Sequence, residues 1–520
     1  MKKVNFRYIP CLFTIPVSIL AASLASAQPG GIPGSIAMYQ ENCAVCHGEN
    51  LEGAAQGRPL RGELLHGDSV SEIAASISRG YESSGMPSWQ RSLSDVQIRN
   101  LALYIAEARI NVDYQTFNYD APLIIPDDVI ATELHSFRIE TVASDLAAAP
   151  FSIAPLPDGR LLLTEKKIGV SIIGLDGKQS ALIRGTPQAY DDSFILSMDQ
   201  ERGWGWIFDI ALHPDYQENG WIYLSYSDRC ERCNALSRAA DSPVSMIKLI
   251  RGRIEDGAWI DQQTIWEADL EHYGNQTDLA AGGRIAFDDG GHVFFSVGVK
   301  GVDVSYGIQD LEFPWGKIHR INDDGSIPAD NPFADRDNVY RSIYTIGHRS
   351  PGGLEFDTQG GGLWGTEHGP RGGDEVNLLL PGGNYGWPLT SLGMNYNGTP
   401  VNHGDELNIA FELADIQQPI VDLTPSPAVS SFIISSSEKF PEWNGDFLVG
   451  SLKARSLYRF QIRNNVLVSR ETLLQDLARI RDIEQGFNGE IYLLLEHNSG
   501  SRIVRLVPED QISEQKSVSQ

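Results

Sequence analysis

A strand-and-turn unit recurs through residues 136–507 and constrains the fold more than any other feature of the chain. Apolar runs such as "GRLLLTE", "GWIYLSYS" and "GEIYLLLE" each follow a polar turn. These turns are marked by Asp158, Asp215, Asp289, Asp357, Asp446 and Asn488. Their irregular spacing fits one four-stranded sheet per unit, with loops of variable length between the strands. We therefore predict a mainly β fold, a six-bladed β-propeller, because a closed ring of sheets protects its strand edges. A two-sheet sandwich is the alternative.

A Cys-x-x-Cys-His motif precedes these repeats and consists of Cys43, Cys46 and His47. Two thiols at this spacing form thioether bonds to the vinyl groups of haem, and the adjacent imidazole ligates the iron. A zinc site is the alternative, but it would need a second pair of ligands. Met86, in "YESSGMPSW", is the expected sixth ligand of the iron, and His66 is a competing candidate. The motif predicts one covalently bound haem c.

Residues 28–112 are predicted to form a small all-α cytochrome c domain. "GSIAMYQENC" is typical of an opening helix, and "SLSDVQIRNLALYIAEAR" combines a Ser/Asp cap with apolar residues at helical spacing. Residues 113–135 are polar, contain prolines and lack periodicity, which indicates a linker. Residues 508–520 form a polar tail.

Residues 1–27 have the pattern of a signal peptide. Three cationic residues precede the apolar run "CLFTIPVSILAASLA", which ends in Ala25-Ser26-Ala27. We expect cleavage before Gln28 and export to a bacterial periplasm. No later stretch has the roughly 18 to 20 continuous apolar residues that cross a bilayer, so we predict no transmembrane segment.

The charge balance excludes some partners. The chain has 41 Lys and Arg residues against 68 Asp and Glu residues, a formal net charge of −27. Such a surface repels nucleic acids and anionic membranes, so we predict that neither is a partner.

Several loop segments contain residue patterns that a simple turn does not require. "GHRSP", "EHGPRGGDEVN" and "GGNYGWP" occur in that order, followed by "DLTPSPAVSS" and "ARIRDIEQGFNG". This series resembles the quinoprotein glucose/sorbosone dehydrogenase family over residues 136–507. The resemblance implies a six-bladed propeller that uses pyrroloquinoline quinone (PQQ) and calcium to oxidise sugars. In cytochrome-fused members of the family, the haem domain accepts the electrons.

The resemblance also implies a set of cofactor contacts. PQQ carries three carboxylates and an electrophilic dione, so its pocket needs fixed cations, and guanidinium groups suit both kinds of oxygen. Arg349, Lys453, Arg479 and Arg481 match the family's PQQ-contacting cations, and Thr424 matches a further contact. Arg349 is expected to polarise the reactive quinone oxygen. Arg479 and Arg481 alternate along a strand and should therefore point to the same face.

Calcium in this family is held largely by backbone oxygens, as a hard cation requires. Gly369 and Pro370 match that loop. Glu367, Asp374 and Tyr385 are open candidates for a second, structural calcium site.

The chain departs from the family on the substrate side of the site. Ala280 occupies the position where sugar-oxidising relatives carry the histidine that takes the hydroxyl proton, and a methyl group accepts no proton. Trp204 replaces a family glutamine, and Ser350 replaces an asparagine after Arg349.

Three explanations of the missing histidine stay open. Another side chain acts as the base, with Asp209, His272 and Asp278 as candidates; the substrate needs no such base; or the propeller binds a ligand without turnover. His213 and His348 are expected to be scaffolding residues.

The sequence thus predicts a periplasmic quinohaemoprotein dehydrogenase. A sugar or other alcohol or hemiacetal would pass a hydride to PQQ, and the electrons would leave through haem c to a downstream periplasmic acceptor. The alternative is a non-enzymatic PQQ-binding or electron-transfer protein. Cys230 and Cys233 lack a following histidine, and in an exported protein they favour a loop disulfide.

Overall fold

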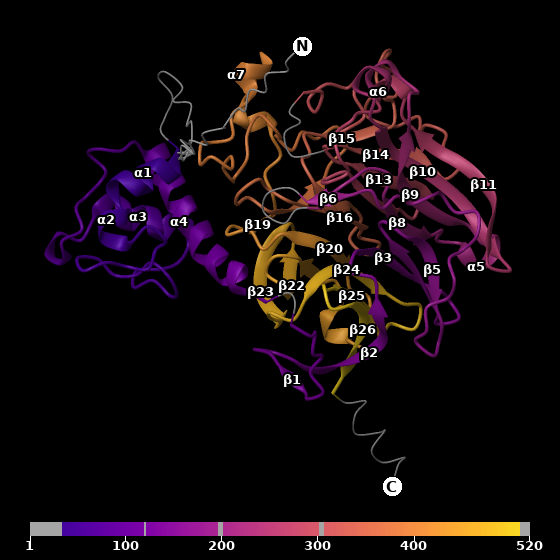
Figure 1. Ribbon diagram of the computed structural model, residues 1–520, viewed down its shortest axis with the longest axis horizontal. Helices are drawn as coiled ribbons and strands as arrows, with labels where there is room; N and C mark the ends of the chain where they lie inside the picture. The colour runs from indigo at the N-terminus through magenta and orange to yellow at the C-terminus, as the bar shows by residue number, and fades with distance from the viewer. Residues whose placement is uncertain (1–33, 119–120, 196–200, 301–305, 510–520) are drawn as a thin grey trace, which may run out of the picture.

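The computed structural model describes residues 34–118, 121–195, 201–300 and 306–509 (Figure 1). The expected signal peptide and nearly all of the expected polar tail lie outside these ranges. Within them, no helix combines the length and the apolar character needed to span a membrane.

The N-terminal part is helical, as predicted. Its helices are α1 (Ser35–Asn42), α2 (Ala44–His47), α3 (Val70–Arg79), the 3-10 turn η1 (Glu82–Ser84) and α4 (Asp95–Thr116). Ser69 and Ser94 begin α3 and α4 with capping boxes, in which each serine accepts a hydrogen bond from the third residue of the helix. Met38, Tyr39 and Leu101 lie at the centre of one apolar cluster that joins α1, α3 and α4. The cap after "SL" therefore starts the long helix where the sequence predicted it.

The rest of the chain forms the six blades of a propeller. The first blade has three strands, β3 (Pro150–Pro155), β4 (Leu161–Glu165) and β5 (Gly169–Ile173). The second contains β8 (Ile207–Leu212), β9 (Ile222–Cys230), β10 (Val244–Glu255) and β11 (Ala258–Glu267). The third contains β12 (Gly282–Phe287), β13 (His292–Val297), β14 (Lys317–Asn322) and β15 (Ile343–Ile346).

The fourth blade contains β16 (Pro351–Phe356), β17 (Leu363–Glu367), β18 (Glu375–Leu379) and β19 (Val421–Asp422). The fifth contains β20 (Val429–Ile434), β21 (Phe447–Ser451), β22 (Leu457–Arg463) and β23 (Val466–Leu474). The sixth contains β24 (Arg479–Gln485), β25 (Ile491–Glu496), β26 (Ser501–Pro508), β2 (Ser136–Leu146) and the short β1 (Ile130–Ala131). A separate hairpin pairs β6 (Phe194–Ile195) with β7 (Glu201–Arg202).

The six sheets close into a ring through contacts between their first strands and through the pairing of an N-terminal strand with the last blade. The first strands of the blades contact one another in sequence, from β3 through β8, β12, β16, β20 and β24 back to β3. The last blade is completed by the N-terminal strand β2, which pairs antiparallel with β26, for example Ile139 with Leu506. Each turn marked by a repeated Asp or Asn lies between the first and second strands of its blade. The repeat therefore predicted the blades correctly.

Short helical turns decorate the loops: α5 (Tyr216–Asn219), α6 (Ala235–Ala240), η3 (Leu270–His272), α7 (Gly404–Leu407), η4 (Leu413–Asp415) and η5 (Pro441–Trp443). Cys230 and Cys233 form a disulfide between β9 and α6, with their Cα atoms 6.0 Å apart.

Candidate cofactor sites

The haem motif lies at the junction of α1 and α2. Cys43 and Cys46 are free thiols, and Cys43 and Met86 both border the apolar cluster of the helical domain. The Nδ1 atom of His47 lies 2.8 Å from the carbonyl oxygen of Arg58, which favours the tautomer that donates to this oxygen. That bond fixes the ring and leaves Nε2 as the ligating atom, the usual arrangement of an iron-bound imidazole. The residues present therefore fit a haem group.

His66, the competing ligand candidate, stacks its ring on Tyr81 with the ring centroids 4.1 Å apart. Met86 forms a backbone bridge with the same Tyr81. Both candidates thus lie near one loop.

Arg349 lies just before β16, where the chain turns in towards the propeller axis. Its Nη1 atom donates to the carbonyl oxygens of His368 and Gly369, each at 3.2 Å, and its Nη2 atom donates to the hydroxyl of Tyr396 at 3.1 Å. The side chain also lies over the ring of Trp387. Arg349 of "HRS" and Gly369 of the "GP" loop, which come from separate motifs, are therefore in direct contact.

A cavity beside Arg349 has unused hydrogen-bond donors. Arg349, Glu367, Gly369, Glu375 and Trp387 are among its lining residues. Within the described part of the chain, Arg349 Nε and Trp387 Nε1 are buried donors without a hydrogen-bond partner. Leaving such a group unpaired costs about 1–3 kcal/mol, so two such donors on residues that line one cavity are compatible with a ligand that has acceptor oxygens. The cavity fits the dione and carboxylate oxygens of PQQ.

Arg479 and Arg481 approach the same region from β24. Arg479 Nε lies 2.7 Å from Glu496 Oε1, and Arg481 Nε lies 2.6 Å from Glu496 Oε2. The two arginines therefore point to one face, as their alternation predicted. Their charges hold the pKa of Glu496 far below its usual range in spite of burial. Burial and the charges of Arg349 and Arg481 also lower the pKa of His368, which places His368 within reach of both cations.

Thr424 and Lys453 lie on the side of the site that faces the helical domain. The Thr424 hydroxyl accepts a hydrogen bond from Gly373 N at 2.9 Å. The Lys453 ammonium group lies 3.5 Å from the carboxylate of Glu107, which belongs to α4.

Two contributors to this region were missed from the sequence. Lys166, just after β4, contributes to the low pKa of Glu496, and Glu107 contacts Lys453. Nothing in "TEKKIG" or "IAEAR" marks them, because both contacts join distant parts of the chain.

The expected calcium loop has an oxygen-rich wall. The cavity is lined by Gly369 and by the carboxyl-bearing residues Glu367 and Glu375. Burial, followed by the charge of Glu367, raises the pKa of Glu375 to about 8, so a bound cation would stabilise its ionised form. Oxygen donors of this kind fit a hard cation. Pro370 follows Gly369 in the same loop.

The candidates for a second calcium site have structural partners. Glu367 accepts from His348 Nδ1 at 2.8 Å and from the backbone of Arg349. Asp374 accepts from Gly369 N and Val429 N, each at 3.0 Å. Tyr385 donates to Leu378 O at 2.6 Å. These side chains hold the loop in shape, and His348 has the scaffolding role predicted for it.

Ala280 lies in the loop before β12 with a φ of 68°. Among the candidate bases near it, Asp209 is buried on the propeller axis, where it pairs with Arg284 at 3.2 Å and accepts from Ile285 N at 2.8 Å. Asp278 accepts from Ser227 at 2.7 Å and lies 3.2 Å from Lys300. Both carboxylates therefore have several donors that hold the strands together.

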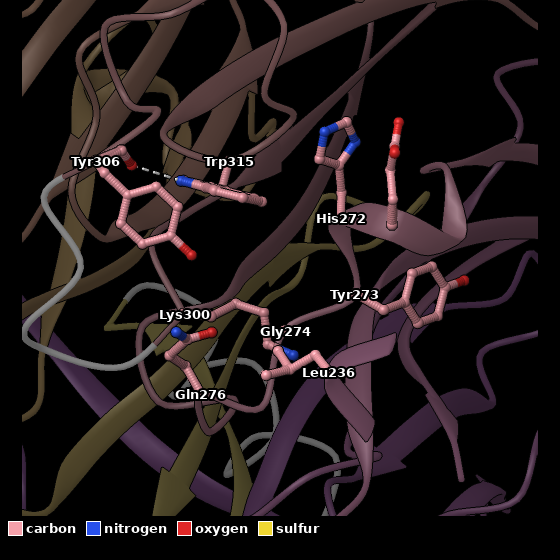
Figure 2. Close-up of a pocket in the computed structure, with 9 residues that line it drawn as sticks. Leu236, His272, Tyr273, Gly274, Gln276, Lys300, Tyr306 and Trp315 are labelled. Carbon is pink, nitrogen blue, oxygen red and sulfur yellow. Dashed lines mark hydrogen bonds between the residues drawn. The ribbon is translucent and has the colours of Figure 1, made fainter. Parts of the chain in front are cut away.

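His272 lines a second cavity, between the second and third blades (Figure 2). Its Nδ1 atom lies 2.7 Å from the hydroxyl of Tyr340, which leaves Nε2 available within the described contacts. Tyr306 and Trp315 lie on one side of this cavity, and His272 and Tyr273 lie on the other. Of the three candidate bases, His272 is the one that borders a cavity.

Fold and site together define the class: a six-bladed propeller with a cavity lined by Arg349 and by carboxyl-bearing residues, joined to a helical domain that carries a haem-binding motif. Residues 147–505 match the family model for glucose/sorbosone dehydrogenase, and residues 36–105 match that for cytochrome c oxidase, cbb3-type, subunit III. The chain belongs to the glucose/sorbosone dehydrogenase family and has an N-terminal cytochrome c domain.

Relatives cover the propeller almost completely. The chain is 31% identical to aldose sugar dehydrogenase YliI of Escherichia coli over 383 residues, which is 73% of this chain and 95% of that protein. It is 27% identical to quinoprotein glucose dehydrogenase B of Acinetobacter calcoaceticus, over 66% of this chain and 69% of that protein. The apo-form crystal structure of the E. coli soluble aldose sugar dehydrogenase superimposes with a TM-score of 0.61 at 29% identity, covering 72% of this chain and 100% of that one. These relatives support an oxidoreductase.

Proposed function

We propose that this protein is a periplasmic quinohaemoprotein dehydrogenase that oxidises a sugar, or another alcohol or hemiacetal. When bound, PQQ would accept a hydride, and covalent haem c would take its two electrons one at a time and pass them to a downstream periplasmic acceptor. The observation that carries the proposal is a pair of buried donors, Arg349 Nε and Trp387 Nε1, that have no partner among the described residues and belong to side chains lining one cavity with the Gly369 loop.

Different side chains around this cavity would bind different oxygen atoms of PQQ. Arg349 is anchored by the carbonyl oxygens of His368 and Gly369, and its Nε–H, which has no partner among the described residues, would donate to the ligand. Arg479 and Arg481 are held by Glu496 and would bind carboxylates, and Lys453 and Thr424 would do so from the opposite side. A pocket whose side chains are already held by such contacts loses little entropy when it binds a rigid anion.

Calcium would be held at the Gly369–Pro370 loop by backbone oxygens, with Glu375 close by. The role proposed for it is that of a Lewis acid beside the dione. The cysteines 43 and 46 would form the thioether bonds, and His47 and Met86 would ligate the iron.

Proton removal is the step for which the chain lacks the family's residue. Ala280 accepts no proton, and the carboxylates of Asp209 and Asp278 already serve buried donors. We keep His272 and Asp209 as the proposed bases: His272 borders a second cavity, separate from the one beside Arg349, and keeps one ring nitrogen available among the described contacts, whereas Asp209 is buried and paired with Arg284. The loss of the histidine at position 280 is also what favours the alternative, a PQQ-binding or electron-transfer protein without turnover.

Haem reduction tests the proposal and separates it from the alternative. Purified haem-loaded protein is reconstituted with PQQ and calcium, and the haem absorbance is followed with a panel of aldoses, polyols and simple alcohols. Reduction by at least one substrate, only in the presence of PQQ, is the expected result. PQQ binding without reduction by any substrate supports the alternative, and failure to bind PQQ overturns both.

A further inference from the structure

One face of helix α4 lies against the propeller loops that surround the expected PQQ site (Figure 1). Arg99, Leu103 and Glu107 are spaced four residues apart and therefore lie on one side of the helix. Arg99 donates to the carbonyl oxygen of Leu392 at 3.2 Å. Leu103 and Glu107 approach Gly372 so closely that a Cβ atom there would lie 2.9 Å from Leu103 Cδ1. The helical domain thus docks at the cofactor end of the propeller.

Glu107 is the charged residue at the centre of this contact. Its side chain is 2% exposed, it accepts a hydrogen bond from the backbone N–H of Ser426 at 2.6 Å, and it lies 3.5 Å from the Lys453 ammonium group. Ser426 lies two residues beyond Thr424, a second expected PQQ contact. A carboxylate from the haem domain is therefore placed against Lys453, which matches a PQQ contact, and against the backbone two residues beyond Thr424, which matches another.

The electrostatics beside Lys453 favour one carboxylate over two. Burial raises the pKa of Glu107, the charge of Lys453 lowers it, and the charge of the nearby Asp374 raises it again. The Lys453 side chain is partly buried, with 26% of it exposed, and Glu107 is an anionic partner for its ammonium group. A carboxylate of PQQ at Lys453 would be a second anion in the same place, and like charges in a desolvated site repel strongly.

We propose that Glu107 stands in for a PQQ carboxylate at Lys453 in the cofactor-free protein, and that α4 releases Lys453 when PQQ binds. This inference rests on the proposed function, because it takes Lys453 as a PQQ ligand. It makes the haem domain a part of the cofactor site rather than a tethered acceptor only. Cofactor loading and the docking of the haem domain are then linked, and each changes the free energy of the other by the same amount.

The test compares PQQ affinity in three haem-loaded, full-length proteins: wild type, Glu107→Gln and Asp95→Asn. The glutamine keeps the shape and an oxygen for Ser426 N but removes the charge. Asp95 is an exposed residue at the start of the same helix and controls for the change in net charge. PQQ binding is measured by equilibrium dialysis. We expect Glu107→Gln to bind PQQ about ten-fold more tightly, and Asp95→Asn to match the wild type.

Hydrogen exchange of α4 gives a second readout that does not depend on activity. PQQ should increase exchange at the amides of residues 99–111 in the wild type, because the helix loses its contact with Lys453. Equal or weaker PQQ binding by Glu107→Gln, or slower exchange of α4 on PQQ binding, overturns the inference alone. Absence of PQQ binding by all three proteins overturns the proposed function, and the inference with it.

Discussion

Arg349 Nη1 lies 3.2 Å from the carbonyl oxygen of Gly369, and this bond joins the arginine expected to act on the quinone to the loop expected to hold calcium. The contact helps to hold the guanidinium group, whose Nε has no hydrogen-bond partner within the described residues. One hydrogen bond therefore positions the parts of two cofactor sites relative to each other.

Replacing Arg349 with lysine should weaken PQQ binding although the charge is kept. Lysine keeps three donors, but they diverge from a single nitrogen, so it cannot reproduce the planar arrangement in which Arg349 bonds the His368 and Gly369 carbonyls and presents Nε–H. We expect the Kd for PQQ to rise about 10- to 100-fold in a dialysis measurement, since one or two charge-assisted hydrogen bonds are lost. Arg336→Lys, at an exposed residue that packs on Phe333, is the matched control and should bind PQQ like the wild type. Equal weakening in both variants would contradict a specific role of Arg349 in PQQ binding.

Returning histidine to position 280 should raise turnover of aldoses. Ala280→His supplies the proton acceptor that the chain lacks, and general base catalysis typically contributes 10²–10⁴-fold. The positive φ of Ala280 is tolerated by histidine better than by branched residues. We expect at least a roughly ten-fold faster haem reduction with an aldose in the PQQ-loaded protein. An unchanged rate would show that His272 already accepts the hydroxyl proton or that the substrate requires no such base.

His272→Ala separates these two cases. If His272 takes the hydroxyl proton, the variant should reduce haem about 100-fold more slowly while its Kd for PQQ stays the same. His292, which bonds Asp288 away from the axis, provides a control as His292→Ala. Unimpaired turnover in His272→Ala would remove the assignment.

The stability of the propeller should depend on Glu496 at acid pH. Its two arginine partners hold the pKa of Glu496 below the unfolded value of about 4.5, so the folded state binds fewer protons. The contribution to the free energy of unfolding is therefore complete above pH 4.5 and is lost as the pH falls further. Glu496→Gln should cost about 3 kcal/mol at pH 7 in urea denaturation. It should also show a smaller loss of stability between pH 4.5 and pH 3 than the wild type, and parallel curves for the two proteins would contradict this account.

Met86→Ala should lower the reduction potential of the haem, because a thioether ligand stabilises the reduced iron. His66→Ala should leave the potential unchanged, since its ring packs on Tyr81. A redox titration monitored by haem absorbance measures both. The opposite pattern would make His66 the sixth ligand.

The local parts of the fold were predictable, because strands and turns are specified within a few residues. The turns at Asp158 and Asn488 each lie between the first and second strands of a blade, and the cap at Ser94 begins α4. The strand pairing that closes the ring could not be predicted from the sequence, because it joins β2 to β26, more than 350 residues away. That pairing depends on tertiary packing rather than on local pattern.

The candidate site divides in the same way. The common direction of Arg479 and Arg481 followed from strand alternation, and both contact Glu496. The role of Glu107 could not be predicted from the sequence, because its local pattern is that of an ordinary helix residue. Its contact with Ser426, 319 residues away, exists only in the folded chain. The partners of Asp209 could not be predicted from the sequence either, because Arg284 belongs to the next blade.

The most direct test of the central claim is the rate of haem reduction in the PQQ-loaded, full-length protein at several protein concentrations. The substrate is mixed rapidly with the protein, and the haem absorbance is recorded. Because donor and acceptor belong to one chain, we predict a first-order rate constant that stays the same over a ten-fold dilution. A rate that falls in proportion to protein concentration, or haem that stays oxidised, would contradict electron transfer from the propeller to its own haem domain.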